Sequence, residues 1–130
     1  MSATVLEGVT TVLLVDWPEK AVPEAWVRAG YETHSHEGPE PDEYYVYVTN
    51  GDEIAMTKTG RAPDRIDLVY TYRPADELEE IVEFAKARGA RIVWFEVSRA
   101  NQDMADDARA IVERAGLAYV DEPVLDVLGS

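Results

Sequence analysis

The chain has 130 residues and a formal net charge of −14, from 26 acidic and 12 basic side chains. Such a field repels phosphate backbones, so nucleic acid is not expected as a partner. The absence of cysteine excludes disulfides, thiolate nucleophiles and sulfur-ligated metals. No apolar run approaches the roughly 20 residues of a membrane span, and Met1–Thr10 lacks the basic start of a signal peptide. We expect one domain, residues 1–130, in a cytoplasmic protein without a membrane partner.

The first quarter of the chain predicts a strand, a helix and a second strand. An apolar β-forming run predicts the first strand over Thr11–Val15. The helix is predicted over Pro23–Ala29, with Pro23 at its first position and Gly30 as its stop. A more polar strand is predicted over Tyr31–His36.

The middle of the chain predicts a β-hairpin. Tyr44–Thr49 and Glu53–Lys58 flank Asn50-Gly51, a dipeptide typical of the type I′ turn, whose two central residues need positive φ. We interpret this hairpin as an addition to the edge of a larger sheet. An exposed edge strand offers unpaired backbone groups to a second chain, so a homodimer is its simplest use.

A strand–helix–strand pattern follows the hairpin. Two apolar, β-branched runs, Ile66–Tyr72 and Arg91–Val97, enclose an amphipathic helix over Ala75–Arg88. Such a crossover forces its two strands to be parallel. Asn101–Ala115 is predicted as the next helix and Leu117–Val120 as the last strand. The acidic tail beyond it is long enough for one more helical turn.

These elements indicate an α/β fold: a Rossmann-like three-layer sandwich with a mainly parallel sheet of about five strands plus an added β-hairpin. A ferredoxin-like α+β fold is the alternative, but it needs fewer parallel runs. In a doubly wound sheet, ligands enter the crevice beyond the carboxyl ends of the strands. Arg73 follows a central strand there, and its guanidinium can hold a phosphate or carboxylate through two hydrogen bonds. The alternative is that Arg73 pairs with a neighbouring acidic side chain.

The loop after the first strand, residues 16–23, argues against a conventional pyrophosphate cradle. It contains no glycine, and its two prolines lack the N–H groups that such a cradle uses. Glu19 and Glu24 stand where a phosphate would lie, and Lys20 is the only local compensation.

Other site chemistries have weaker patterns. His34 and His36 alternate on one strand face near Glu37, but no third metal ligand has a compelling spacing. Ser35 and Ser98 lack the sequence context of a hydrolase nucleophile. We therefore predict no catalytic residue and no metal ligand, and an enzyme is the third choice of function.

Several short segments, in order and spacing, carry a family resemblance. They are Val12–Val15, Ala29–Tyr31, Asp67–Val69, Tyr72–Pro74, Gly89–Glu96, Asn101 and Ala115–Asp121. This arrangement resembles the small bacterial CoA-binding domain family, which is related to the CoA-binding Rossmann domain of succinyl-CoA ligase α subunits. The resemblance implies a domain that binds CoA or an adenine nucleotide without catalysing a reaction.

The resemblance also implies which residues bind the ligand. The residues so implied are Asp16, Trp17 and Lys20 at the phosphates, Arg73 and Pro74 along the cleft, and Glu96 and Ser98 at its end. The chain departs from the family at three places. Where the family usually has a Val-Gly-x-Ser-like turn, this chain has residues 15–18. Where the family tends to have Gln and Gly after the Val-Trp strand, this chain has Glu96 and Ser98. Where a cysteine is common near the last strand of the family, this chain has Glu122-Pro123.

Two function classes follow. The first is a non-catalytic CoA- or nucleotide-binding domain. The second is a degenerate Rossmann-like module that has lost ligand binding and serves self-association or protein–protein interaction. Its contact surface would be the hairpin with Tyr44, Tyr45 and Tyr47. The glycine-free loop is the feature that separates them.

Overall fold

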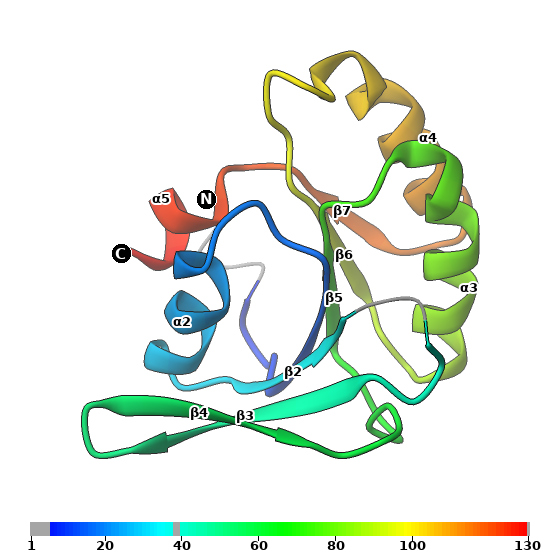
Figure 1. The fold of residues 1–130 in the computed structure, drawn as a ribbon. Coiled ribbons are helices and arrows are strands. Elements are labelled where there is room, and N and C mark those ends of the chain that lie inside the picture. The colour runs from blue at the N-terminus through cyan, green and yellow to red at the C-terminus, as the bar shows by residue number, and fades with distance from the viewer. Residues whose placement is uncertain (1–5, 38–39, 130) are drawn as a thin grey trace.

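In a computed structural model, which describes residues 6–37 and 40–129, a sheet lies between two layers of helices (Figure 1). The strands are β1 (Thr11–Val15), β2 (Glu32–His36), β3 (Tyr44–Asn50), β4 (Glu53–Lys58), β5 (Leu68–Thr71), β6 (Ile92–Phe95) and β7 (Ala118–Val120). The helices are α2 (Ala21–Arg28), α3 (Leu78–Ala87), α4 (Ala105–Arg114) and α5 (Val124–Leu128). Two short 3₁₀ turns, η1 (Ala75–Glu77) and η2 (Gln102–Met104), precede α3 and α4. None of these helices is long and apolar enough to cross a membrane.

The two faces of the sheet bury two separate cores. Along β1, Leu13 packs into the core under α3 and α4, whereas Val12 and Leu14 pack into the core under α2 and α5. In β6, Trp94 and Phe95 likewise divide between the two cores, which is the arrangement of a parallel strand covered on both faces. The predicted three-layer α/β sandwich is confirmed.

The strand order, β4-β3-β2-β1-β5-β6-β7, places the ligand crevice. Strands β2, β1, β5, β6 and β7 are parallel, as predicted. The chain leaves β1 toward β2 on one side and later returns to β5 on the other side of β1. The connections that leave the carboxyl ends of β1 and β5 therefore run to opposite faces of the sheet. This point of reversal is where open α/β sheets bind ligands.

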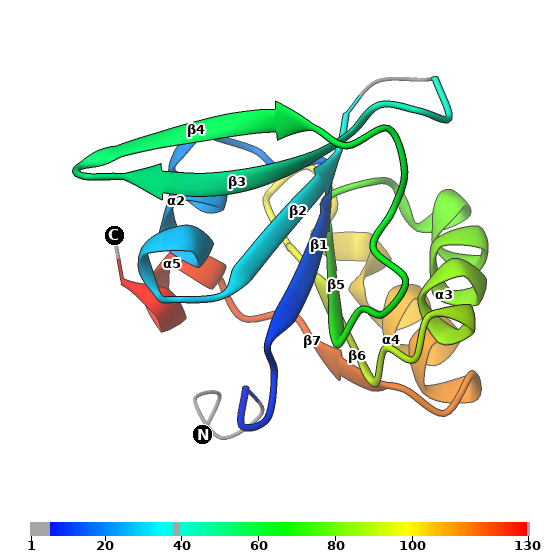
Figure 2. The same ribbon diagram turned by 90° about the horizontal axis from the view of Figure 1, so that it is seen from below.

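The hairpin extends the sheet beyond β2, where β3 pairs antiparallel to it (Figure 2). Its turn differs from the prediction. Asn50 pairs with Glu53, so the two central residues are Gly51 and Asp52. Only Gly51 has a positive φ, 68°, which is the pattern of a type II′ turn. The predicted Asn50-Gly51 type I′ turn is wrong by one residue, because Asn50 stays extended and glycine alone takes the left-handed conformation.

Helix α2 begins at Ala21, two residues before the predicted start. Pro23 is therefore its third residue instead of its first. The first turn of a helix tolerates proline at this place, because its N–H groups have no intrahelical acceptor. The acidic tail forms the helix α5, whose Val124 is buried in the core beside α2.

Candidate ligand-binding site

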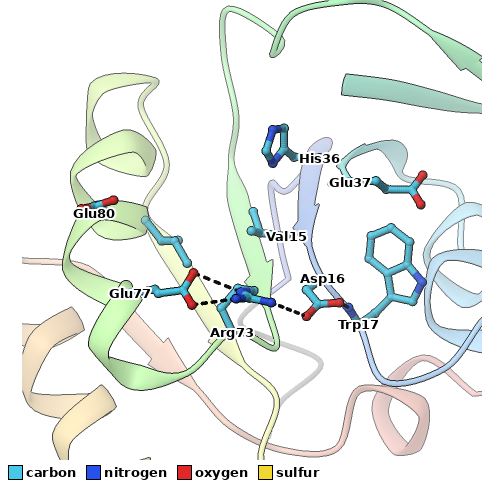
Figure 3. Close-up of a pocket in the computed structure, with 9 residues that line it drawn as sticks. Val15, Asp16, Trp17, His36, Glu37, Arg73, Glu77 and Glu80 are labelled. Carbon is cyan, nitrogen blue, oxygen red and sulfur yellow. Dashed lines mark hydrogen bonds and ion pairs between the residues drawn. The ribbon is translucent and has the colours of Figure 1, made fainter. Parts of the chain in front are cut away.

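A cavity of about 720 Å³ lies at the reversal point between β1 and β5 (Figure 3). Its lining residues are Val15, Asp16 and Trp17 after β1, His36 and Glu37 at β2, Arg73 after β5, and Glu77, Glu80 and Ile81 from η1 and α3. Its volume falls within the range of ligand pockets, roughly 300–1,000 Å³. The cavity therefore has the position and the size of a small-molecule site.

Arg73 is the one Lys or Arg among these lining residues, and two carboxylates hold it. Its Nη2 and Nε donate to the two oxygens of Glu77, at 2.7 Å and 3.1 Å, and its Nη1 donates to Oδ2 of Asp16 at 3.2 Å (Figure 3). The hydrogen bonds to Glu77 raise the pKa of Arg73 and lower the pKa of the Glu77 carboxyl. Pairing with neighbouring acids, the alternative stated above, is thus the arrangement that the structure shows. An incoming anion must share or displace these partners.

Asp16 has an unusual backbone conformation. Its φ is 68°, and within residues 6–37 and 40–129 it is the only non-glycine residue with a positive φ. Oδ1 of Asp16 accepts the N–H of Trp17 at 2.9 Å. A short polar side chain that accepts the N–H of the next residue makes the left-handed conformation tolerable at a position that favours glycine.

A second cavity, of about 370 Å³, lies between the start of α2 and the hairpin. Its lining residues are Trp17, Lys20, Pro23, Glu24, Glu37, Tyr47, Ile54 and Met56. Trp17 and Glu37 also line the first cavity, so the two cavities adjoin each other. The lining of this second cavity is more apolar than that of the first, and three of its eight residues come from the hairpin.

The charge of the first cavity is strongly one-sided. Four acidic side chains, those of Asp16, Glu37, Glu77 and Glu80, line it together with the single guanidinium of Arg73. Such a lining opposes a ligand with several phosphates in contact with it. The charge of the lining therefore favours a ligand with few negative groups.

The structure brings together only part of the predicted site. Asp16, Trp17 and Arg73 line the first cavity, and Lys20 lines the second. Pro74 precedes η1 and lines neither cavity.

Glu96 and Ser98 also lie outside both cavities. Glu96 is 6% exposed and accepts the hydroxyl of Tyr70 at 2.7 Å and the N–H of Val124 at 3.3 Å. Burial raises the pKa of its carboxyl. Ser98 accepts the hydroxyl of Tyr72 at 3.1 Å and donates its N–H to Asn101 at 2.7 Å. Both residues organise the chain around β6 and the following loop.

The predicted ligand-binding residues did not include four further side chains that line the cavity, those of His36, Glu37, Glu77 and Glu80. Two signals were available. Glu77 stands four residues after Arg73, the spacing of a helical ion pair. His36 and Glu37 stand at the end of a strand that neighbours β1.

The two histidines have local partners. Nε2 of His34 donates to Oε2 of Glu32 at 2.8 Å, and Nε2 of His36 donates to the carbonyl of Glu40 at 3.2 Å. The His36 ring also packs on Tyr44, with 4.5 Å between the ring centroids. Across the part of the chain that the structure describes, no three His, Asp or Glu side chains are grouped to hold a metal ion.

The family model of the CoA binding domain matches residues 45–129. This chain belongs to the CoA-binding domain family. The matched part of this CoA-binding domain runs from β3 to α5 and includes Arg73. It leaves out β1, β2 and the loop that carries Asp16 and Trp17. No protein with curated annotation gives a significant match.

Solved structures share the fold of this CoA-binding domain. Prb, a protein redesigned for binding, has a TM-score of 0.62 at 19% identity, with 98% of this chain and 90% of that chain covered. A hypothetical protein from Pyrococcus horikoshii OT3 has a TM-score of 0.59 at 21% identity, with coverage of 92% and 81%. The cell-free ID.343 protein from Thermus thermophilus has a TM-score of 0.63 at 14% identity, with coverage of 96% and 91%. At these identities the likeness concerns the fold alone.

Proposed function

We propose that this chain is a single, non-catalytic binding domain for CoA or a related adenine nucleotide, with the ligand in the cavity between β1 and β5. The observation that carries the proposal is the place of this cavity. It lies at the reversal point of the sheet in a member of the CoA-binding domain family. Arg73 supplies a cation to its lining and Trp17 an aromatic side chain.

Binding is expected to be weak and to depend on Arg73 more than on the first loop. The loop offers no glycine-lined row of N–H groups, and the N–H of Trp17 already bonds Asp16. The Nη1 group of Arg73, which bonds Asp16, can donate to a ligand phosphate while Nε and Nη2 keep their two bonds to Glu77. Lys20 contributes a second positive charge from the adjoining cavity.

The proposal is tested by calorimetric titration and thermal unfolding with CoA, acetyl-CoA, NAD and ATP. A ligand that binds only the folded state raises its stability, by about 2.7 kcal/mol at a concentration of 100 times the Kd. At least one of the four compounds should raise the unfolding temperature at millimolar concentration. No shift and no heat with any of them would favour the degenerate module instead.

Self-association is the second candidate function, and the free edge of the sheet favours it. β4 is the last strand in the sheet order. Two large apolar side chains of the hairpin, Val48 and Met56, are 46% and 47% exposed. Both features are typical of a surface that pairs with a second copy of the chain.

A further inference from the structure

Glu37 is the cavity residue whose hydrogen bonding is incomplete. Its Oε2 is buried from solvent and accepts no hydrogen bond from the described residues. Glu37 lines both cavities and stands where they adjoin. A buried carboxylate oxygen is costly unless a donor reaches it. A bound molecule with hydroxyl groups at this junction would supply that donor.

The place of Glu37 in the fold indicates which hydroxyl groups these are. It directly follows β2, which neighbours β1 in the sheet, and it stands 21 positions after Asp16. In open α/β sheets that bind dinucleotides, an acidic residue about 20 residues beyond the first loop accepts hydrogen bonds from the ribose of adenosine. Glu37 therefore has the right residue type at the right distance along the chain and at the right strand end.

The second cavity provides a surface for the base beside that ribose. Trp17, Tyr47 and Met56 line it, and Glu37 stands at its border with the first cavity. Flat aromatic side chains stack on purine rings, and this contact needs no charge. A base in the second cavity would leave the rest of the nucleotide in the first cavity, toward Arg73.

We infer that Glu37 accepts the hydroxyl groups of a ribose without a phosphate, with the adenine against Trp17 and Tyr47. The inference rests on the proposed function and adds an order of preference to it. CoA carries a phosphate on the ribose 3′ oxygen and NADP carries one on the 2′ oxygen, whereas dephospho-CoA and NAD carry neither. A ribose phosphate would meet Glu37 and Glu24, with only Lys20 in the second cavity to offset them.

Calorimetric titration of the wild-type protein with these two matched pairs tests the inference. Dephospho-CoA should bind at least about tenfold tighter than CoA, and NAD at least about tenfold tighter than NADP, because the members of each pair differ only in that phosphate. Glu37→Gln keeps the shape of the side chain and removes its charge while Glu24 stays, so each ratio should fall at least about threefold toward one. Glu83→Gln removes one charge from an exposed position of α3 outside both cavities and should leave the ratios unchanged.

The ratios of affinity measured on the wild-type protein test the inference even if Glu37→Gln fails to fold. Equal affinity of the wild-type protein for CoA and dephospho-CoA would overturn the role of Glu37 and leave the proposed function standing. A wild-type preference that Glu37→Gln keeps, in a variant with normal thermal unfolding, would also overturn it. If none of the four compounds binds, the proposed function fails, and the inference fails with it.

Discussion

Oδ2 of Asp16 lies 3.2 Å from Nη1 of Arg73, so the residue after β1 and the residues after β5 are joined across the reversal point of the sheet (Figure 3). Glu77 holds the same guanidinium from its other side at 2.7 Å. Both ion pairs are partly exposed, and such pairs add at most about 1 kcal/mol each to stability. Their main effect is on the cavity: the one guanidinium of its lining already has two carboxylate partners, which an anionic ligand would have to share or displace.

Replacing Arg73 is expected to weaken ligand binding. Arg73→Ala removes charged hydrogen bonds to a phosphate, a loss of about 1.5–3 kcal/mol, or roughly 10- to 150-fold in Kd. The affinity of Arg73→Lys should lie between those of the wild type and Arg73→Ala, because an ammonium keeps the charge but lacks the planar geometry of the guanidinium. Titration calorimetry measures both. Arg109→Ala, which changes an exposed arginine of α4 paired with Glu113, is the control and should bind like wild type. Tight binding by Arg73→Ala would place the site elsewhere.

Asp16 should respond to substitution according to its backbone conformation. Asp16→Ala keeps a Cβ at φ 68° and loses the bond to the Trp17 N–H, whereas Asp16→Gly relieves the conformation. In urea unfolding, Asp16→Ala should be about 1 kcal/mol less stable than Asp16→Gly. Asp16→Gly should also bind CoA or NAD more tightly than wild type, because it releases Arg73. Equal stability of the two variants would contradict the first expectation, and unchanged affinity the second.

The sequence predicts the layers of this fold well, because they depend on burial patterns that repeat along the chain. Strand β6 is apolar at every position, so it must be covered on both faces, and Trp94 and Phe95 are. The turn of the hairpin was placed one residue early. Asn and Gly both tolerate positive φ, and only the pairing of Asn50 with Glu53 decides which residue takes it.

The site was less predictable than the fold, because it depends on where side chains end in space. The sequence left open whether Arg73 binds an anion or pairs with a neighbouring acidic side chain. One of its partners is Asp16, which is 57 positions away in the sequence. Glu96 follows β6 as expected, yet its side chain turns into the core toward Tyr70. No spacing in the sequence reports the direction of either side chain.

Glu96 should make stability depend on pH in an unusual direction. Burial raises the pKa of its carboxyl above the ordinary 4.5, so the folded state binds its proton more readily than the unfolded state. This contribution to stability is present at low pH and is lost as the pH rises through the raised pKa. Glu96→Gln keeps an acceptor for Tyr70 without the charge. Its stability relative to wild type should therefore increase from pH 4.5 toward pH 7 in denaturant titrations.

Glu77 should make stability depend on pH in the opposite direction to Glu96. Its pKa is lowered, first by its hydrogen bond to Arg73, so its contribution is present near neutral pH and is lost as the pH falls through the lowered pKa. Glu77→Gln should thus lose stability relative to wild type at pH 7 and approach it in acid. If the stability of Glu96→Gln relative to wild type changed with pH in the same direction as that of Glu77→Gln, the raised pKa of Glu96 would be contradicted.

If the edge of β4 serves self-association, the dimer should strengthen with salt. Each chain carries a formal charge of −14, so two copies repel each other, and ions screen that repulsion. Light scattering at high protein concentration should show a rise from the 14.5 kDa monomer toward twice that mass as sodium chloride increases from 20 to about 500 mM, over which the screening length falls severalfold. A constant monomer mass throughout would remove this role for the hairpin.

The three tryptophans are unequally placed, and this gives the protein an optical reporter of its own. Trp26 and Trp94 are fully buried and pack edge to face at 5.6 Å, so their emission should be blue-shifted and indifferent to ligands. Trp17 is partly exposed at the wall shared by the two cavities. A nucleotide that stacks on this indole should quench only the red part of the emission spectrum. The emission spectrum of a Trp17→Phe protein should not change when the same nucleotide is added. Occupancy of the site can thus be followed in unlabelled protein.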